Sequence, residues 1–237
     1  LRMNLTLNTD FAQVEADRQQ INLTRFPLFF PERREFFLEG QDYFDMGMGN
    51  STIPFYSRKI GLAEDRSTVP IIAGARILGK VKNSTLGALS MQTASRDSIP
   101  STNYSVVSWR QDVMKQSSIG ILSANKYENG RWHSTTGGYG LYSTSKLFGD
   151  KNLNIGASFT QNINSDNYDS KANAHRIYLS YPNDKVEFDM AWQRSAPAFN
   201  PEVGFLRRDN FQEFYAELEW KPRPKNFLKW IRQFSFK

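Results

Sequence analysis

The sequence predicts an all-β fold, as part of an antiparallel, up-and-down transmembrane β-barrel with roughly ten to thirteen strands. Three observations predict this class. Apolar and polar residues alternate in runs of about nine to twelve residues. Short turn signals separate the runs, and no convincing amphipathic helix interrupts them, although residues 225–232 could be read as helix or strand.

The alternation has a period of two, which gives each predicted strand one apolar and one polar face. In residues 185–193, Val186, Phe188, Met190 and Trp192 occupy alternate positions, and most residues between them are charged. The same pattern is found in four other segments, least cleanly in the last: residues 1–8, 152–161, 211–220 and 69–81. These five segments predict strands with one dry face and one wet face.

Turn-forming residues separate the strands and indicate a meander. Gly, Asn, Asp and Pro gather in short connections at 82–83, 128–130, 149–150 and 182–184. Longer polar connections occur at 94–103 and 164–173. Short turns at one end of the sheet and longer loops at the other are typical of an up-and-down barrel.

A soluble β-sandwich would alternate in the same way, so strand length and face composition must decide between the two. The predicted strands approach the nine to eleven residues that a tilted strand needs to cross a bilayer. Full charges such as Glu187 and Glu217 lie on the polar faces. Aromatic residues, among them Trp192, Tyr104 and Tyr181, stand near the ends of apolar runs, as in an interfacial girdle. Together these features favour the membrane barrel.

Composition excludes several other classes. The 237 residues are 39% hydrophobic, and no window approaches the roughly 18 consecutive apolar residues of a membrane helix. Cysteine is absent, which excludes disulfides and cysteine-based metal or redox sites. The net charge of +6 is spread over the chain, and the one basic cluster, residues 221–225, lies in a proline-rich turn. We therefore expect no nucleic-acid partner.

The opening sixty residues resemble a known family. The residues that carry the resemblance are LNTDFAQVEADRQQINLTRFPLFFPERREFFLEGQDYF, at 7–44, and IPFYSRKIGL, at 53–62; residues 69–81 and 199–211 also fit. The sequence resembles an outer-membrane family of Gram-negative bacteria that joins an N-terminal module, similar to carbohydrate-binding family 9, to a C-terminal β-barrel of unassigned function. The resemblance implies that residues 1–237 are a fragment of the barrel domain. The carbohydrate-binding module would lie upstream and the closing strands downstream.

The most specific part of that resemblance, at about residues 26–40, combines five phenylalanines with a block of four charges. Pro27 and Pro31 remove hydrogen-bond donors and argue against a regular central strand. We expect an in-folded segment whose phenylalanines pack against the wall or lipid. Its charges would point into the lumen and pair there, because an unpaired buried charge costs several kcal/mol. The predicted lumen cluster is Glu32, Arg33, Arg34, Glu35, Asp10, Glu15, Asp17 and Arg18. Bracing of the barrel, an arginine constriction for anionic solutes, and solvated loop charges remain alternative roles.

No catalytic, cofactor or metal motif is found. The two histidines, His133 and His175, have no Ser or Asp partner at a known spacing, and His175 shares the parity of an apolar face. Asp166 and Asp169 lack the glycine and distal glutamate of a calcium loop. We expect no enzyme activity and no cofactor. Because catalytic residues can be far apart in sequence, a barrel-embedded hydrolase stays open as the alternative.

Three functions remain open. The first is an outer-membrane barrel for transport or surface handling of nutrients or glycans. The second is a structural barrel in a larger outer-membrane complex, and the third is a soluble sandwich that binds a ligand. The first two imply contact with the lipid bilayer and lipopolysaccharide, and with other outer-membrane proteins or a glycan as further partners.

Overall fold

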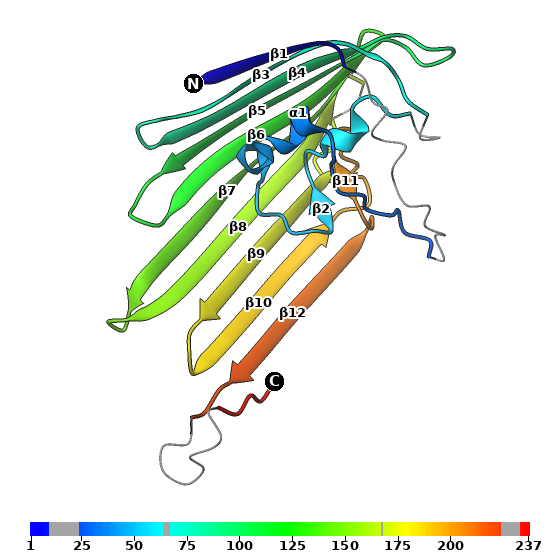
Figure 1. Ribbon diagram of the computed structural model, residues 1–237. Coiled ribbons are helices and arrows are strands. Elements are labelled where there is room, and N and C mark those ends of the chain that lie inside the picture. Colours follow the sequence, from blue (N-terminus) through cyan, green and yellow to red (C-terminus); the bar gives the residue numbers. More distant parts are fainter. Residues whose placement is uncertain (10–23, 64–66, 167, 224–232) are drawn as a thin grey trace.

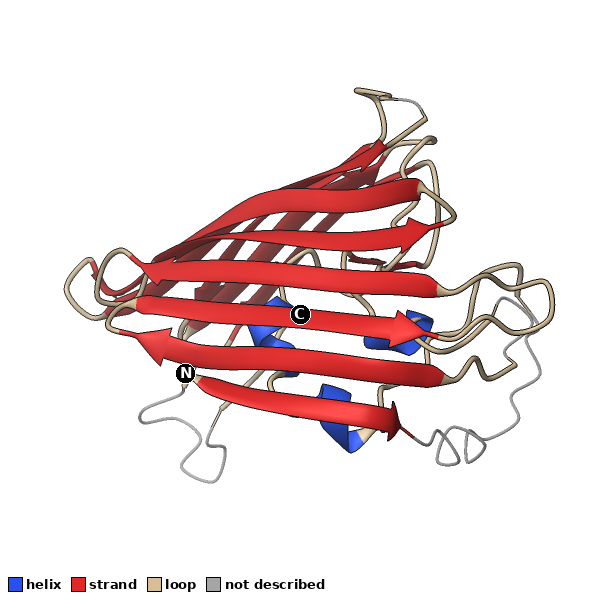
Figure 2. Cartoon of the chain, turned by 90° about the horizontal axis from the view of Figure 1, so that it is seen from above, coloured by secondary structure: helices blue, strands red, loops and turns tan. Residues whose placement is uncertain are grey.

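The chain forms one long antiparallel sheet that curves around a short inner segment (Figures 1 and 2). The computed structural model describes residues 1–9, 24–63, 67–166, 168–223 and 233–237. The sheet contains ten strands in the order β1-β3-β4-β5-β6-β7-β8-β9-β10-β12. Their bounds are β1 Arg2–Thr9, β3 Ile71–Val81, β4 Ser84–Thr93, β5 Thr102–Asp112, β6 Ser118–Glu128, β7 Arg131–Leu147, β8 Lys151–Asn164, β9 Asn173–Pro182, β10 Val186–Ser195 and β12 Phe211–Trp220.

Each strand pairs with its sequence neighbours, apart from short elements inserted between them, so the predicted antiparallel meander is confirmed. Strands β1 and β12 form the two edges, and the sheet is not closed. Among the described residues, no helix is long and apolar enough to span a membrane.

The connections differ between the two ends of the sheet. At one end, strands are joined by two to five residues, as between Val81 and Ser84 or between Pro182 and Val186. At the other end, the connections are mostly longer, and the one between β1 and β3 contains the inner segment. The exception there is the tight turn at Asn129-Gly130, where both residues have positive φ, as a type I′ hairpin turn requires. The predicted separation of short turns from long loops is otherwise confirmed.

The inner segment, residues 24–63, lies on the concave face of the sheet (Figures 1 and 2). It contains α1 (Glu35–Leu38), two 3₁₀ helices, η2 (Gln41–Phe44) and η3 (Ser57–Lys59), and β2 (Thr52–Ile53). Strand β2 pairs with β11 (Phe205–Leu206) from the loop before β12. No strand forms at residues 24–34, so the prediction that prolines prevent a central strand there is confirmed.

The hydrophobic core lies between this segment and β3–β6. Phe37, Phe44, Met46 and Phe55 of the inner segment belong to one buried cluster with concave-face residues of the sheet. Those wall residues are Leu78, Leu89, Met91, Tyr104, Val106 and Leu122. Burying a side chain of this size stabilises the fold by about 1.5–3 kcal/mol. Phe37, Phe44 and Phe55 therefore fix the inner segment to the wall. Of the phenylalanines at 26–40, Phe37 belongs to this cluster and Phe36 packs partly against it, whereas Phe29 is 48% exposed.

The register assigns each strand residue to a face. Residues that pair with buried core positions face inward, and their neighbours face outward. The outward, convex face is apolar and exposed across the sheet, at residues that include Leu5, Ile77, Val107, Ile121, Ile155, Ile177 and Leu218. His175 shares this face, with its ring 4.7 Å from that of Trp192, which confirms the face predicted for it.

One prediction about the aromatic residues is wrong. Tyr104 was expected near a strand end with Tyr181, in a girdle on the apolar face. The register instead places Tyr104 inward, where it is 9% exposed and belongs to the core cluster. In this half of the sheet the concave face is itself apolar because the inner segment covers it, so an aromatic residue near the end of an apolar run can face inward.

Candidate functional site

A row of polar side chains crosses the concave face below the core. The register brings Arg110, Tyr139, Ser158, Arg176 and Glu213 to neighbouring inward positions on β5, β7, β8, β9 and β12. Gly120 on β6 and Gln193 on β10 complete the row. The residues lie far apart in sequence, and the antiparallel register alone aligns them. They form the wall side of the candidate site.

Two glycines allow the tyrosine rings of this wall to lie against the sheet. Gly120 pairs with Tyr139, and a Cβ at Gly120 would lie 2.5 Å from that ring. Gly156 pairs with Tyr178 in the same way, with 2.1 Å from a Cβ to the ring. Real Cβ atoms do not approach a ring so closely. The glycines therefore fix where both phenols stand.

The two wall arginines lie beside the two tyrosines. Arg110 and Tyr139 are register neighbours on either side of Gly120. Arg176 stacks on Tyr178, with its guanidinium carbon 4.7 Å from the ring centroid, and donates to the Gly47 carbonyl over 3.1 Å. A cation over an aromatic face is stabilised by the ring quadrupole. Arg176 therefore also attaches the inner segment to β9.

The inner segment supplies two carboxylates opposite this wall, around η2. Gly40 precedes η2 with a φ of 77°, and a Cβ there would meet the Leu78 side chain at 2.2 Å. Phe44 anchors η2 in the core, while Asp42 and Asp45 remain exposed. Asp45 accepts the Gly47 N–H over 2.8 Å, which fixes its turn.

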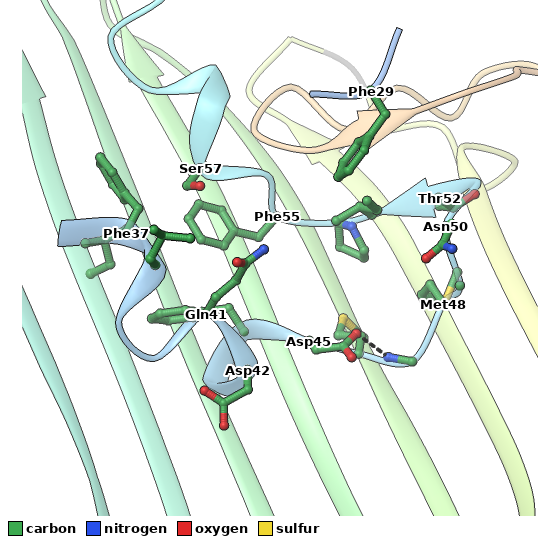
Figure 3. Close-up of a pocket in the computed structure, with 18 of the residues that line it drawn as sticks. Phe29, Phe37, Gln41, Asp42, Asp45, Met48, Asn50, Thr52, Phe55 and Ser57 are labelled. Carbon is green, nitrogen blue, oxygen red and sulfur yellow. Dashed lines mark hydrogen bonds between the residues drawn. The ribbon is translucent and has the colours of Figure 1, made fainter. Parts of the chain in front are cut away.

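Two cavities adjoin at this turn. The larger, about 690 Å³, lies within the inner segment and reaches Arg76, Leu89 and Arg176 of the wall. Figure 3 shows Phe37, Phe55 and Ser57 on one side of it and Phe29, Asn50 and Thr52 on the other, with Gln41 between them. The smaller, about 290 Å³, lies between the turn and the wall at Arg110, Tyr139 and Tyr178. Both cavities are lined by Asp42, Asp45, Met46 and Gly47.

The predicted charge block divides into two buried and two exposed residues. Glu32 and Arg34 are 6% and 5% exposed and form an ion pair at 2.7 Å. Arg34 also donates to the carbonyls of Ile60 and Ser57, both over 2.7 Å, and its guanidinium lies 4.2 Å from the Phe37 ring. Because these groups occupy Arg34, it braces the inner segment and does not face the cavities.

The remaining predicted residues take other places. Arg33 and Glu35 are exposed. Asp10, Glu15, Asp17 and Arg18 lie outside the described residues, so their predicted pairing with the block stays a prediction.

The environment of Glu32 keeps its carboxylate charged. Burial by itself raises the pKa of Glu32. The hydrogen bonds and positive charge of Arg34 and the hydroxyl of Ser57, which donates over 2.6 Å, outweigh burial and hold the pKa below its ordinary value of 4.5.

A second brace, which the sequence did not predict, joins the inner segment to β3. Arg76 is 2% exposed, pairs with the Glu39 carboxylate, and donates to the Glu39 carbonyl over 2.6 Å and to the Phe36 carbonyl. Its guanidinium stacks on the Phe36 ring at 4.8 Å. The only available signal was one arginine within an apolar strand, and that signal does not identify a partner 37 residues away in sequence.

The concave face becomes acidic toward β10 and β12. Five carboxylates share it, at Glu187, Asp189, Glu213, Glu217 and Glu219. Lys221 lies 2.6 Å from the Glu187 carboxylate and 2.8 Å from that of Glu219, and Lys237 pairs with Glu217 at 2.5 Å. The structure confirms that the carboxylates of these strands share one face.

These arrangements provide hydrogen bonds and charge, and they do not resemble a known catalytic constellation. His133 lies on the concave face and His175 on the convex face, so the described chain does not bring its two histidines together. Within the described ranges, no group of three or more His, Asp or Glu side chains could hold a metal ion.

Comparison with known proteins yields one match. Residues 1–86 match the model of a family described as a domain of unknown function, DUF5916. This is consistent with the resemblance carried by the opening sixty residues, and the family description assigns no activity. No curated protein and no solved structure matches the chain.

Proposed function

We propose that this chain forms part of the wall of a β-barrel in the outer membrane of a Gram-negative bacterium, with the inner segment packed inside it. The observation that carries the proposal is the asymmetry of the sheet. Large apolar side chains are exposed on the convex face of nine of the ten strands, β4 excepted, while most charges of the strands lie on the concave face. Soluble monomers rarely expose an apolar patch above a few hundred Å².

Strand length and tryptophan placement support the same reading. The ten strands contain 8–17 residues, and about 9–11 are needed to cross a bilayer with tilt. All four tryptophans of the described residues belong to the convex face: Trp109, Trp132, Trp192 and Trp220. Two lie toward each end of the sheet, as in the aromatic girdles of membrane barrels.

The role proposed for the barrel is passage or surface handling of small hydrophilic nutrients, glycans among them. The cavities between the inner segment and the wall support it, because they are lined by carboxylates, phenols and guanidinium groups. A structural role in a larger complex is the second candidate. The apolar core and the Arg76–Glu39 brace favour it, because they hold the inner segment firmly in place.

Heat-modifiable migration of the full-length protein tests the membrane barrel. A barrel stays compact in detergent, migrates faster unboiled, and shifts on boiling. The proposal predicts that shift, together with flotation of the protein with lipid vesicles. A protein that remains monodisperse without detergent and migrates identically boiled and unboiled contradicts it, and favours a soluble sandwich in which another sheet covers the convex face.

A further inference from the structure

We propose that the two adjoining cavities form one route for small hydrophilic cations between the inner segment and the wall, and that Asp42 and Asp45 determine its charge selectivity. The inference rests on the proposed function and goes beyond it by naming the route, the class of solute and the selecting residues. It begins from the shared lining, since both cavities contact residues 42, 45, 46 and 47.

A solute that moves from one cavity to the other passes this turn of the inner segment. The larger cavity has Arg176 on its wall side and the smaller has Arg110. The wall tyrosines cannot retreat into the sheet, because their rings already occupy the space over Gly120 and Gly156. The turn cannot move freely either, because Phe44 is buried in the core and Arg176 holds the Gly47 carbonyl. The boundary of the route is therefore fixed on both sides.

The charges that face the route are not equally available to a solute. Arg176 already donates to the Gly47 carbonyl, and Arg110 lies beside the Tyr139 ring across Gly120. By contrast, Asp42 and Asp45 are exposed, and within the described part of the chain neither forms an ion pair. Asp45 accepts one hydrogen bond, from the Gly47 N–H, and keeps its charge. Two carboxylates without an ion-pair partner in the described ranges therefore lie where the cavities adjoin, and carboxylates that line a pore favour cations.

The acidic side of the concave face continues this field. Asp189 and Glu217 are paired directly across β10 and β12, although like charges in that position destabilise a sheet. Lys221 and Lys237 neutralise part of the charge of the five carboxylates on this side. The formal charges of these five carboxylates and two lysines sum to −3 (2 − 5), and a negative charge on this side attracts cations toward the route.

The test is conductance of the full-length protein in planar bilayers, with the reversal potential measured under a KCl gradient. The wild-type protein is expected to conduct and to prefer K⁺ over Cl⁻. Asp42→Asn with Asp45→Asn should lower the permeability ratio by about fivefold for each charge removed, the effect of a unit charge at ~4 Å through water. Arg110→Gln should raise the permeability ratio of K⁺ over Cl⁻.

Asp97→Asn is the matched control, because it removes the same charge from a side chain that is 88% exposed in the β4–β5 loop. Its permeability ratio should equal that of the wild type. Every variant is first checked for the heat-dependent gel shift. If the Asn variant does not fold, Asp42→Cys replaces it. The 237 residues contain no other cysteine, and a cationic thiol reagent should then reduce the current faster than an anionic one.

The outcomes separate this inference from the proposed function. A wild-type protein that shows the heat-dependent shift but does not conduct overturns the route and leaves the membrane wall standing. Conductance that is unchanged by the Asn variant and by modification of Asp42→Cys also overturns it. A protein that neither shifts nor enters the bilayer contradicts the proposed function itself.

Discussion

Replacement of Glu32 by glutamine should release the inner segment from its brace. The substitution keeps the shape of the side chain but removes the charge that faces Arg34, whose side chain is only 6% exposed. Arg34 retains the carbonyls of Ile60 and Ser57 but loses the carboxylate charge of Glu32. Breaking a buried ion pair from one side costs about 3–5 kcal/mol.

Hydrogen exchange of the full-length protein measures this loss locally. The amides of Phe37 and Leu38 both donate to the Arg34 carbonyl over 3.0 Å, so their protection reports the packing of residue 34. A loss of 3–5 kcal/mol corresponds to exchange faster by about 100- to 4,000-fold, since each 1.4 kcal/mol is a factor of ten. The matched control is Asp166→Asn, which breaks the exposed Arg131–Asp166 pair and should cost under about 1 kcal/mol.

The cost comes from the loss of the Glu32 charge beside Arg34, and a double variant tests this cause. Glu32→Gln combined with Arg34→Met removes both charges, and it should recover most of the lost protection. If the amides of Phe37 and Leu38 in Glu32→Gln exchange within about fivefold of their wild-type rates, the Glu32–Arg34 ion pair does not hold the inner segment. A double variant as unprotected as the single one would show that shape, and not charge, supports the segment.

Four further predictions follow from the same structure. The pKa of Glu32 is held below 4.5, so the stability that its charge contributes is complete above that pH and is lost as the pH falls through the lowered pKa. Protection of the Phe37 amide from exchange should therefore fall below about pH 4.5 in the wild type, and Glu32→Gln should show no such step. Gly156→Ala should cost about 1–3 kcal/mol in urea unfolding by displacing Tyr178, whereas Gly140→Ala, whose nearest neighbouring atom would be 4.0 Å away, should be nearly neutral. Phe199→Ala should cost about 3–5 kcal/mol in the same assay because Phe199 is 1% exposed, and Phe148→Ala, at an 89% exposed side chain, should cost under about 0.5 kcal/mol. Ile121→Arg should cost about 2–4 kcal/mol in vesicles if the convex face meets lipid, and Asn154→Arg on the concave face much less; equal costs would contradict that orientation.

The sequence predicted the sheet well because alternation is a local signal. In residues 185–193 the apolar side chains fall on one face and the charges on the other, and the register confirms both assignments. The alternation was less clear in β3, and the girdle position predicted for Tyr104 was wrong. Both lie in the half of the sheet where the inner segment supplies a second apolar environment, so each face there accepts apolar residues.

The candidate site was largely beyond prediction from sequence. The charge block at 32–35 was identified, but the pairing of Glu32 with Arg34 depends on Ser57 and Ile60, which arrive only when the segment folds back. The alignment of Arg110 with Arg176 requires the register of five consecutive strands. Asp42 and Asp45 carry no motif, and only their place between two cavities distinguishes them.

The most direct test of the central claim, that the convex face meets lipid, uses the native tryptophans of the full-length protein. The four described tryptophans all belong to that face, so their fluorescence should be quenched strongly by lipids brominated on the acyl chains and weakly by aqueous iodide. Quenching by iodide with no response to brominated lipid would contradict the account. In that case the convex face would meet water or another protein surface.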